Sequence, residues 1–104
     1  MNEITEQQAG ERLDDLQNHG FCILQKPNGF RFGMDAVLLA HFTRLHPHDR
    51  VADLGTGTGI LPLLMSHTEP TAHFDVFEWQ PDMADMASRS VALNRLEDRI
   101  TVHC

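Results

Sequence analysis

Apolar residues occur in two kinds of pattern along the second two-thirds of this chain. Short, nearly unbroken apolar runs predict β-strands, and longer segments with apolar residues three and four apart predict helices. The predicted strands are 50–54, 73–79 and 99–104. The predicted helices are 34–45, 59–69 and 80–96. From residue 50 onward the order is β-α-β-α-β, which predicts an α/β fold: a parallel sheet with right-handed crossovers, the first half of a doubly wound fold.

Two features of that sheet follow from the pattern. Successive right-handed crossovers predict the strand order 3-2-1, with strand 50–54 at one edge. The apolar run in this strand is typical of a strand covered on both faces. Its unpaired edge is therefore expected to associate, either by pairing with the same strand of a second copy or by forming loose aggregates.

The first third of the chain gives weaker patterns. Residues 1–19 are mostly polar, with Leu13 and Leu16 at helical spacing, and predict a frayed lead-in with one helical turn. A Lys-Pro-Asn-Gly turn lies between two apolar segments and predicts a β-hairpin over 21–33. In helix 34–45, the expected apolar face consists of Val37, Leu38, Ala40, His41 and Leu45.

Composition narrows the function classes. The chain has 104 residues, enough for one small domain, and a formal net charge of −7. Such a charge argues against a general binder of nucleic acid or anionic membranes, because binding to phosphates needs an excess of Lys and Arg. The amino-terminal segment is acidic, and no apolar run approaches the roughly 20 residues of a membrane span, so a cytoplasmic protein is expected. Cys22 and Cys104 are expected to be free thiols.

The segment "VADLGTGTGI" (51–60) carries the strongest candidate chemistry. Gly55, Gly57 and Gly59 follow the strand directly, at the carboxyl edge where open α/β sheets bind ligands. Glycines there allow a tight turn and close approach of a ligand to the backbone. The alternative is a glycine-rich turn without a ligand.

The type of ligand can be narrowed further. The dinucleotide fingerprint needs glycine at position 60, which is Ile60, and a phosphate-binding P-loop needs a lysine that is absent here. Asp53, just before the loop, would repel a pyrophosphate but suits a ligand with an amino group near a sulfonium. These observations favour a cationic ligand over a phosphate.

Glu78 and Trp79 end the second predicted strand. A carboxylate at this edge can accept hydrogen bonds from both hydroxyls of a ribose, the alternative being a solvated acid. The indole can cover an adenine face, the alternative being simple packing.

With the motifs "VADLGTGTGI" and "FEWQPDMADMASRSVALN", the chain resembles the S-adenosylmethionine-binding half of class I methyltransferases. The stretch from Arg12 to Phe42 narrows the resemblance to bacterial enzymes that methylate N6 of the adenine beside the anticodon of a valine tRNA. The resemblance implies S-adenosyl-L-methionine as cofactor and tRNA as partner of the full-length enzyme. By position, it implies that the three loop glycines approach the methionine part, that Asp53 lies near its amino end and that Glu78 holds the ribose.

The resemblance also concerns the first residues of this chain and a family motif that this sequence lacks. Gly33 and Asp35 match the family's Gly-x-Asp and would close over the cofactor from the other side. Residues 1–45 are thus expected to pack on the cofactor site, and 46–104 to form a half-domain truncated after its third strand. The family's Asn-Pro-Pro-aromatic motif, which holds the exocyclic amine of the base, does not occur in this sequence. We expect the chain alone to be inactive and assign it no catalytic residue.

Two function classes remain open from the sequence. One is a methyltransferase represented by its cofactor-binding half, and the other is a non-catalytic nucleotide-binding or interaction module with the same half-fold. A metal site at His46 and His48 lacks further ligands nearby, so a solvated turn is expected there. Lys26 and Arg31 are expected to be solvated charges rather than RNA contacts.

Overall fold

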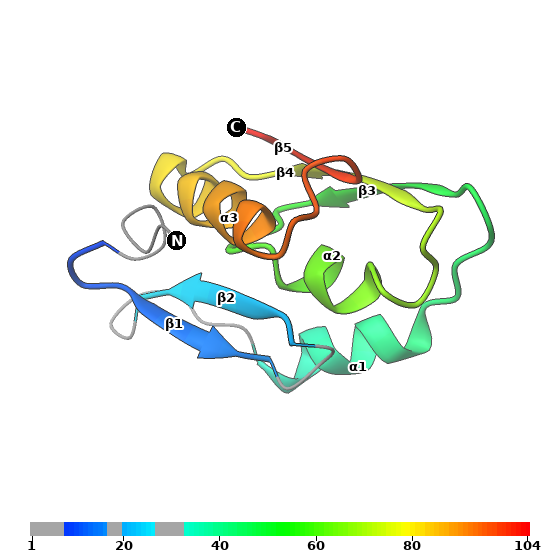
Figure 1. Ribbon diagram of the computed structural model, residues 1–104, viewed down its shortest axis with the longest axis horizontal. Helices are drawn as coiled ribbons and strands as arrows, with labels where there is room; N and C mark the ends of the chain where they lie inside the picture. Colours follow the sequence, from blue (N-terminus) through cyan, green and yellow to red (C-terminus); the bar gives the residue numbers. More distant parts are fainter. Residues whose placement is uncertain (1–7, 17–19, 27–32) are drawn as a thin grey trace.

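The computed structural model describes residues 8–16, 20–26 and 33–104 (Figure 1). Within these residues lie a two-stranded antiparallel sheet, a three-stranded parallel sheet and three helices. In chain order, the elements are β1 (Arg12–Asp15), β2 (Cys22–Gln25), α1 (Met34–Phe42), β3 (Arg50–Leu54), α2 (Ile60–Met65), β4 (His73–Phe77), α3 (Pro81–Leu93) and β5 (Ile100–His103).

The parallel sheet has the order β3-β4-β5, which confirms the predicted α/β topology and strand order. Its register places Asp53 beside Val76, and Val76 beside Val102. The helices end earlier than predicted. Helix α1 stops at Phe42, for example, because the chain becomes extended at Thr43, whose hydroxyl donates to the carbonyl of Leu39 at 2.7 Å.

Helices α2 and α3 lie on the same side of the parallel sheet, and the hairpin and α1 form a further layer beyond them (Figure 1). The expectation that strand 50–54 is covered on both faces is therefore wrong: Ala52 and Leu54 are exposed, and Leu54 keeps 78% of its surface. The physical reason is that both right-handed crossovers step in the same direction across the sheet, which puts both helices on one face.

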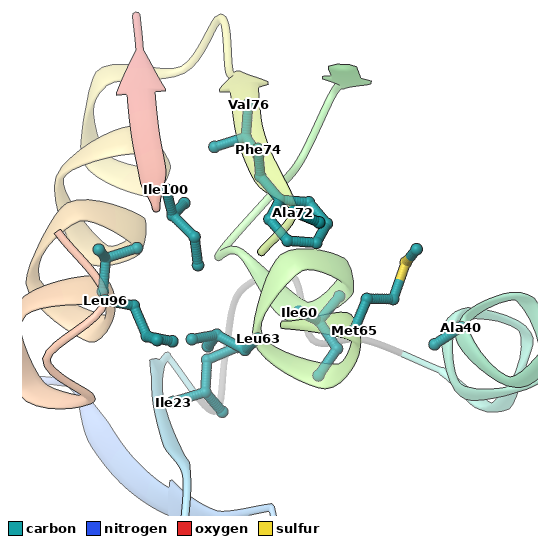
Figure 2. Close-up of a cluster of buried hydrophobic side chains, with 11 residues drawn as sticks. Ile23, Ala40, Ile60, Leu63, Met65, Ala72, Phe74, Val76, Leu96 and Ile100 are labelled. Atoms are coloured by element: carbon teal, nitrogen blue, oxygen red, sulfur yellow. The ribbon is translucent and has the colours of Figure 1, made fainter. Parts of the chain in front are cut away.

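The hydrophobic core fills the space between the sheet and its helices (Figure 2). Phe74 of β4 points from the sheet toward α2, where Leu63 is fully buried, and Val76 of the same strand is fully buried as well. Ile23 of the hairpin and Ala40 of α1 reach the same cluster from the outer layer. The core thus joins all three layers, so the hairpin and α1 fold with the parallel sheet rather than beside it.

The described residues contain a hairpin that the sequence pattern did not predict. Strand β2 pairs with Arg12–Asp15, so β1 and β2 form a hairpin over 12–25, and the helical turn expected in the lead-in is a strand at these residues. The other edge of β2 is occupied by α3, since the Cys22 amide donates to Asn94 Oδ1 and the Leu24 amide to Ser90 Oγ, both at 2.9 Å. Residues 30–32, most of the second strand of the hairpin predicted over 21–33, lie outside the described residues. The Pro27-Asn28-Gly29 turn lies outside the described residues.

Helix α1 also departs from its predicted apolar face. Ala40 is buried and Val37 and Leu45 are half-buried, as expected, but Leu38 and His41 are exposed. Met34, Leu38 and Phe42, one turn apart, keep 69%, 61% and 84% of their surface. Apolar residues surround this helix, so its sequence alone did not select which side packs against α2.

No helix in the described part of the chain is both long and apolar enough to cross a membrane.

Candidate functional site

The glycine loop, residues 55–59, leaves the carboxyl end of β3 and leads into α2. Gly55, Gly57 and Gly59 have φ angles of +75°, +63° and +93°. For a residue with a Cβ, this left-handed conformation is less favourable than the right-handed one by about 1 to 2 kcal/mol. The spacing of the glycines is therefore a requirement of the backbone, as the sequence predicted.

Backbone hydrogen bonds fasten the loop to the end of β4. The amides of Gly55 and Thr56 both donate to the carbonyl of Phe77, at 2.8 and 2.9 Å, and the amide of Gly59 donates to Thr56 within the loop. The loop and the last residues of β4 therefore form one unit, because the Phe77 carbonyl at the end of β4 accepts two hydrogen bonds from the loop.

Glu78 completes this unit. This residue is only 8% exposed. Its two carboxylate oxygens accept hydrogen bonds from the amides of Gly57 (2.8 Å) and Gln80 (3.0 Å). A solvated strand-end acid, the alternative left open by the sequence, does not describe this residue. The structure brings Glu78 and the glycine loop together, as the proposed ribose site requires.

Three buried oxygens at the loop have no hydrogen-bond partner: Asp53 Oδ2, Thr56 Oγ1 and Thr58 Oγ1. Thr58 is fully buried and Thr56 is 5% exposed. An unsatisfied buried polar group costs about 1 to 3 kcal/mol, so three of them within six residues of chain point to a place that a polar ligand completes. Sequence reasoning missed both threonines, because residue type does not reveal whether a hydroxyl is buried without a partner.

The remaining predicted residues lie around this centre less tightly. Trp79, which follows Glu78 in the chain, keeps 92% of its surface. Gly33 is the residue before α1, and a Cβ there would lie 3.0 Å from Asp35 Oδ1, so glycine makes room for this carboxylate. Among the described residues, no hydrogen bond joins Gly33 or Asp35 to the glycine loop.

Other candidate residues are engaged elsewhere. Lys26 Nζ lies 3.9 Å from Asp82 on the first turn of α3, and Arg31 is outside the described residues. The described part of the chain contains no group of three His, Cys, Asp or Glu side chains placed to hold a metal ion. Cys22 and Cys104 form no disulfide with each other in the described part of the chain.

The open face of the sheet carries a separate polar cluster. Asp75 Oδ1 lies 3.0 Å from His103 Nε2, and Asp75 Oδ2 accepts from Arg50 at 3.1 Å. The hydrogen bond to His103, followed by that to Arg50, holds the pKa of the Asp75 carboxyl below its ordinary value. Both of its oxygens are engaged, so this carboxylate is a structural ion pair and no part of the loop site.

Chemically, the loop site offers acceptors and negative charge. Asp53, Glu78 and the two hydroxyls can receive donors from a ligand, and its carboxylates favour a positive charge over a phosphate. S-adenosylmethionine has an amino group, a sulfonium and two ribose hydroxyls. The residues at the loop therefore fit this cofactor, whose chemistry is to supply an activated methyl group.

Sequence comparison places the chain among known proteins. The family model described as the methyltransferase small domain matches residues 33–103. A tRNA1(Val) (adenine(37)-N6)-methyltransferase of a Flavobacteriaceae bacterium is 27% identical over 85 residues, covering 81% of this chain and 37% of that protein. The enzyme of the same name from Yersinia pestis is 32% identical over 84 residues, covering 80% and 34%. The chain thus spans little more than a third of the length of these relatives.

Solved structures support the same fold. The chain is similar to Pyrococcus horikoshii TYW2 in complex with MeSAdo, with a TM-score of 0.71 and 19% identity over 93% of this chain and 36% of that one. It is also similar to a SAM-dependent methyltransferase of Geobacter sulfurreducens in complex with S-adenosyl-L-homocysteine, with a TM-score of 0.58 and 21% identity over 68% and 28%. These findings agree with the cofactor expected from the sequence, and the chain belongs to the methyltransferase small-domain family.

Proposed function

We propose that this chain is the S-adenosylmethionine-binding part of a methyltransferase whose substrate is an adenine N6 in tRNA. The observation that carries the proposal is the set of buried, unpartnered oxygens at the glycine loop, next to the Glu78 carboxylate. The names of the curated relatives support the tRNA adenine as substrate class. With tRNA as the substrate, we place the activity in the cytoplasm.

We assign the binding roles as follows. Asp53 takes the cationic amino end, Glu78 accepts the ribose hydroxyls, and Trp79 covers the adenine. The three loop glycines, Gly55, Gly57 and Gly59, let the methionine part approach the backbone. Gly33 and Asp35 close the site from α1. In this proposal, residues 1–45 pack on the site and residues 46–104 bind the cofactor.

Calorimetry on the 104-residue chain tests the proposal. S-adenosylmethionine is expected to bind and NAD is not, because the loop offers carboxylates where a pyrophosphate would lie. Asp53→Asn should weaken S-adenosylmethionine binding about tenfold or more, the range for a lost hydrogen bond to a charged group. The matched control is Glu97→Gln, which neutralises an exposed acid away from the loop. Binding of NAD without binding of S-adenosylmethionine would contradict the assignment.

We further propose that the chain associates with a second copy through the edge of β3. Among the described strands, β3 pairs with β4 alone, so its other edge presents unpaired backbone groups. Leu54, at the end of that strand, is exposed, and so is the stripe of Met34, Leu38 and Phe42 on α1. A second copy would cover apolar surface as well as pair the strand.

A further inference from the structure

We propose that Glu78 is a positioning residue that holds the glycine loop and the start of α3 in their ligand-ready arrangement before any cofactor binds. This role is additional to the ribose contact. Only its consequence for cofactor affinity rests on the proposed function, because the hydrogen bonds that carry it lie within the chain itself.

The geometry divides the carboxylate between two elements. Oε1 accepts from the Gly57 amide in the middle of the loop, at 2.8 Å, and Oε2 accepts from the Gln80 amide directly before α3, at 3.0 Å. Glu78 is itself fixed to the sheet, since its own amide donates to the carbonyl of His103 at 2.9 Å. One side chain thus joins the sheet, the loop and the helix.

The loop needs such a support because it packs directly on α3. A Cβ at Gly59 would lie 3.4 Å from Cβ of Ala87, so the end of the loop lies against the helix with no side chain between them. Ala87 lies in the middle of α3, so a shift of the helix would take this neighbour away from the loop. By bonding to both, Glu78 fixes their separation.

The carboxylate keeps capacity for a ligand. Two carboxylate oxygens offer about four acceptor positions. The two amides use one on each oxygen, which leaves one on each for a pair of hydroxyls. Glu78 can therefore hold the loop and bind the ribose at the same time. Because the loop is already ordered, less conformational entropy is lost when the cofactor binds.

Glutamine separates this role from a simple ribose contact. A glutamine side chain can accept from one ribose hydroxyl and donate to the other, so it tolerates the ligand. It cannot accept from two amides, because its nitrogen carries only donors and would face either Gly57 N–H or Gln80 N–H. Glu78→Gln should therefore disturb the protein without cofactor.

The experiment measures amide hydrogen exchange by NMR on the 104-residue chain in the absence of cofactor, followed by titration with S-adenosylmethionine. In the unchanged protein, the amides of Gly57 and Gln80 should be protected. Glu78→Gln should raise the exchange rate of at least one of them about tenfold or more, and Glu78→Ala should do so for both. The matched control is Asp82→Asn, an exposed acid on the first turn of α3, which should change neither rate.

Equal exchange rates in Glu78→Gln, Glu78→Ala and the unchanged protein would overturn the proposal. If both variants fail to fold, the unchanged protein still decides, since Gly57 and Gln80 amides that exchange as fast as fully exposed ones would also overturn it. The proposed function fails separately: protected, Glu78-dependent amides without S-adenosylmethionine binding would leave Glu78 as a positioning residue and remove the cofactor assignment.

Discussion

At the scale of single residues, the loop glycines are explained by backbone conformation before any ligand is considered. Gly55 shows this most simply: its φ angle is +75°, and a Cβ at this position would meet nothing within 4 Å. Any penalty for a side chain there comes from the backbone alone.

Gly55→Ala should lower the free energy of unfolding by about 1 to 2 kcal/mol, whereas Gly55→Asn should cost less, because Asn adopts the left-handed region more readily. Urea unfolding of both variants tests this expectation. A cost for Asn equal to or above that for Ala would mean that space, rather than backbone conformation, selects glycine at this position.

The residue scale also shows what kind of site prediction the sequence permits. Asp53, Glu78 and the glycines could be found because each follows a strand end in a recognisable motif. The Thr56 and Thr58 hydroxyls could not be identified in the same way, since whether a hydroxyl is buried without a partner depends on everything that packs around it. Residue type alone does not carry that information.

At the scale of elements, a partly buried ion pair joins the residue before the hairpin to α3. Glu11, just before β1, accepts from the Arg89 guanidinium of α3 with both oxygens, and the Gln8 amide donates to it at 2.9 Å. The Arg89 hydrogen bond, the largest influence, lowers the pKa of Glu11 below its ordinary value. Arg89 also donates to Asp85, on the exposed side of α3, at 3.0 Å.

Glu11→Gln should therefore lower the free energy of unfolding at pH 7 by about 1 to 3 kcal/mol. Because the folded pKa of Glu11 is lowered, its ionised form stabilises the fold above the ordinary glutamate pKa of about 4.3, and this contribution is lost as the pH falls through the folded pKa. The difference between variant and unchanged protein should shrink in acid. Urea unfolding from pH 7 downward measures it, with exposed Glu97→Gln as control; a difference that grows in acid would contradict the assignment.

At the scale of the whole molecule, the open edge of β3 leads to a prediction about association. The molar mass by light scattering should rise with concentration through the micromolar range, because a second copy can pair the free edge and cover Leu54. Leu54→Lys, a charge at the end of the edge strand, should keep the chain monomeric without disturbing the core. If the unsubstituted chain keeps the mass of a monomer at about 100 µM, this mode of association is refuted.

The catalytic prediction also belongs to the whole molecule. The 104 residues contain no Asn-Pro-Pro-aromatic sequence, so no such motif supplies the acceptors that would orient an adenine amine for methyl transfer. The chain alone should transfer no labelled methyl group from S-adenosylmethionine to unmodified tRNA, whereas a full-length relative assayed beside it should. Incorporation of label by the chain alone would show that other residues perform this role.

The sequence by itself determined the features that are written locally: the alternation of strands and helices from residue 50 onward, the parallel order of the strands, and the glycine loop with Asp53 before it and Glu78 at the next strand end. The spacing of apolar residues and the need for glycine in a tight turn are properties of a few neighbouring residues, and a single sequence therefore reveals them.

Only the tertiary structure decided which segments meet. The strand 22–25 pairs with 12–15, and its Cys22 and Leu24 amides donate to Asn94 and Ser90, about 70 positions away in sequence. In the same way, Glu78 bonds to Gly57 and Gln80. These outcomes depend on competition between distant groups for the same donors, acceptors and apolar surface, and a local pattern contains no record of that competition.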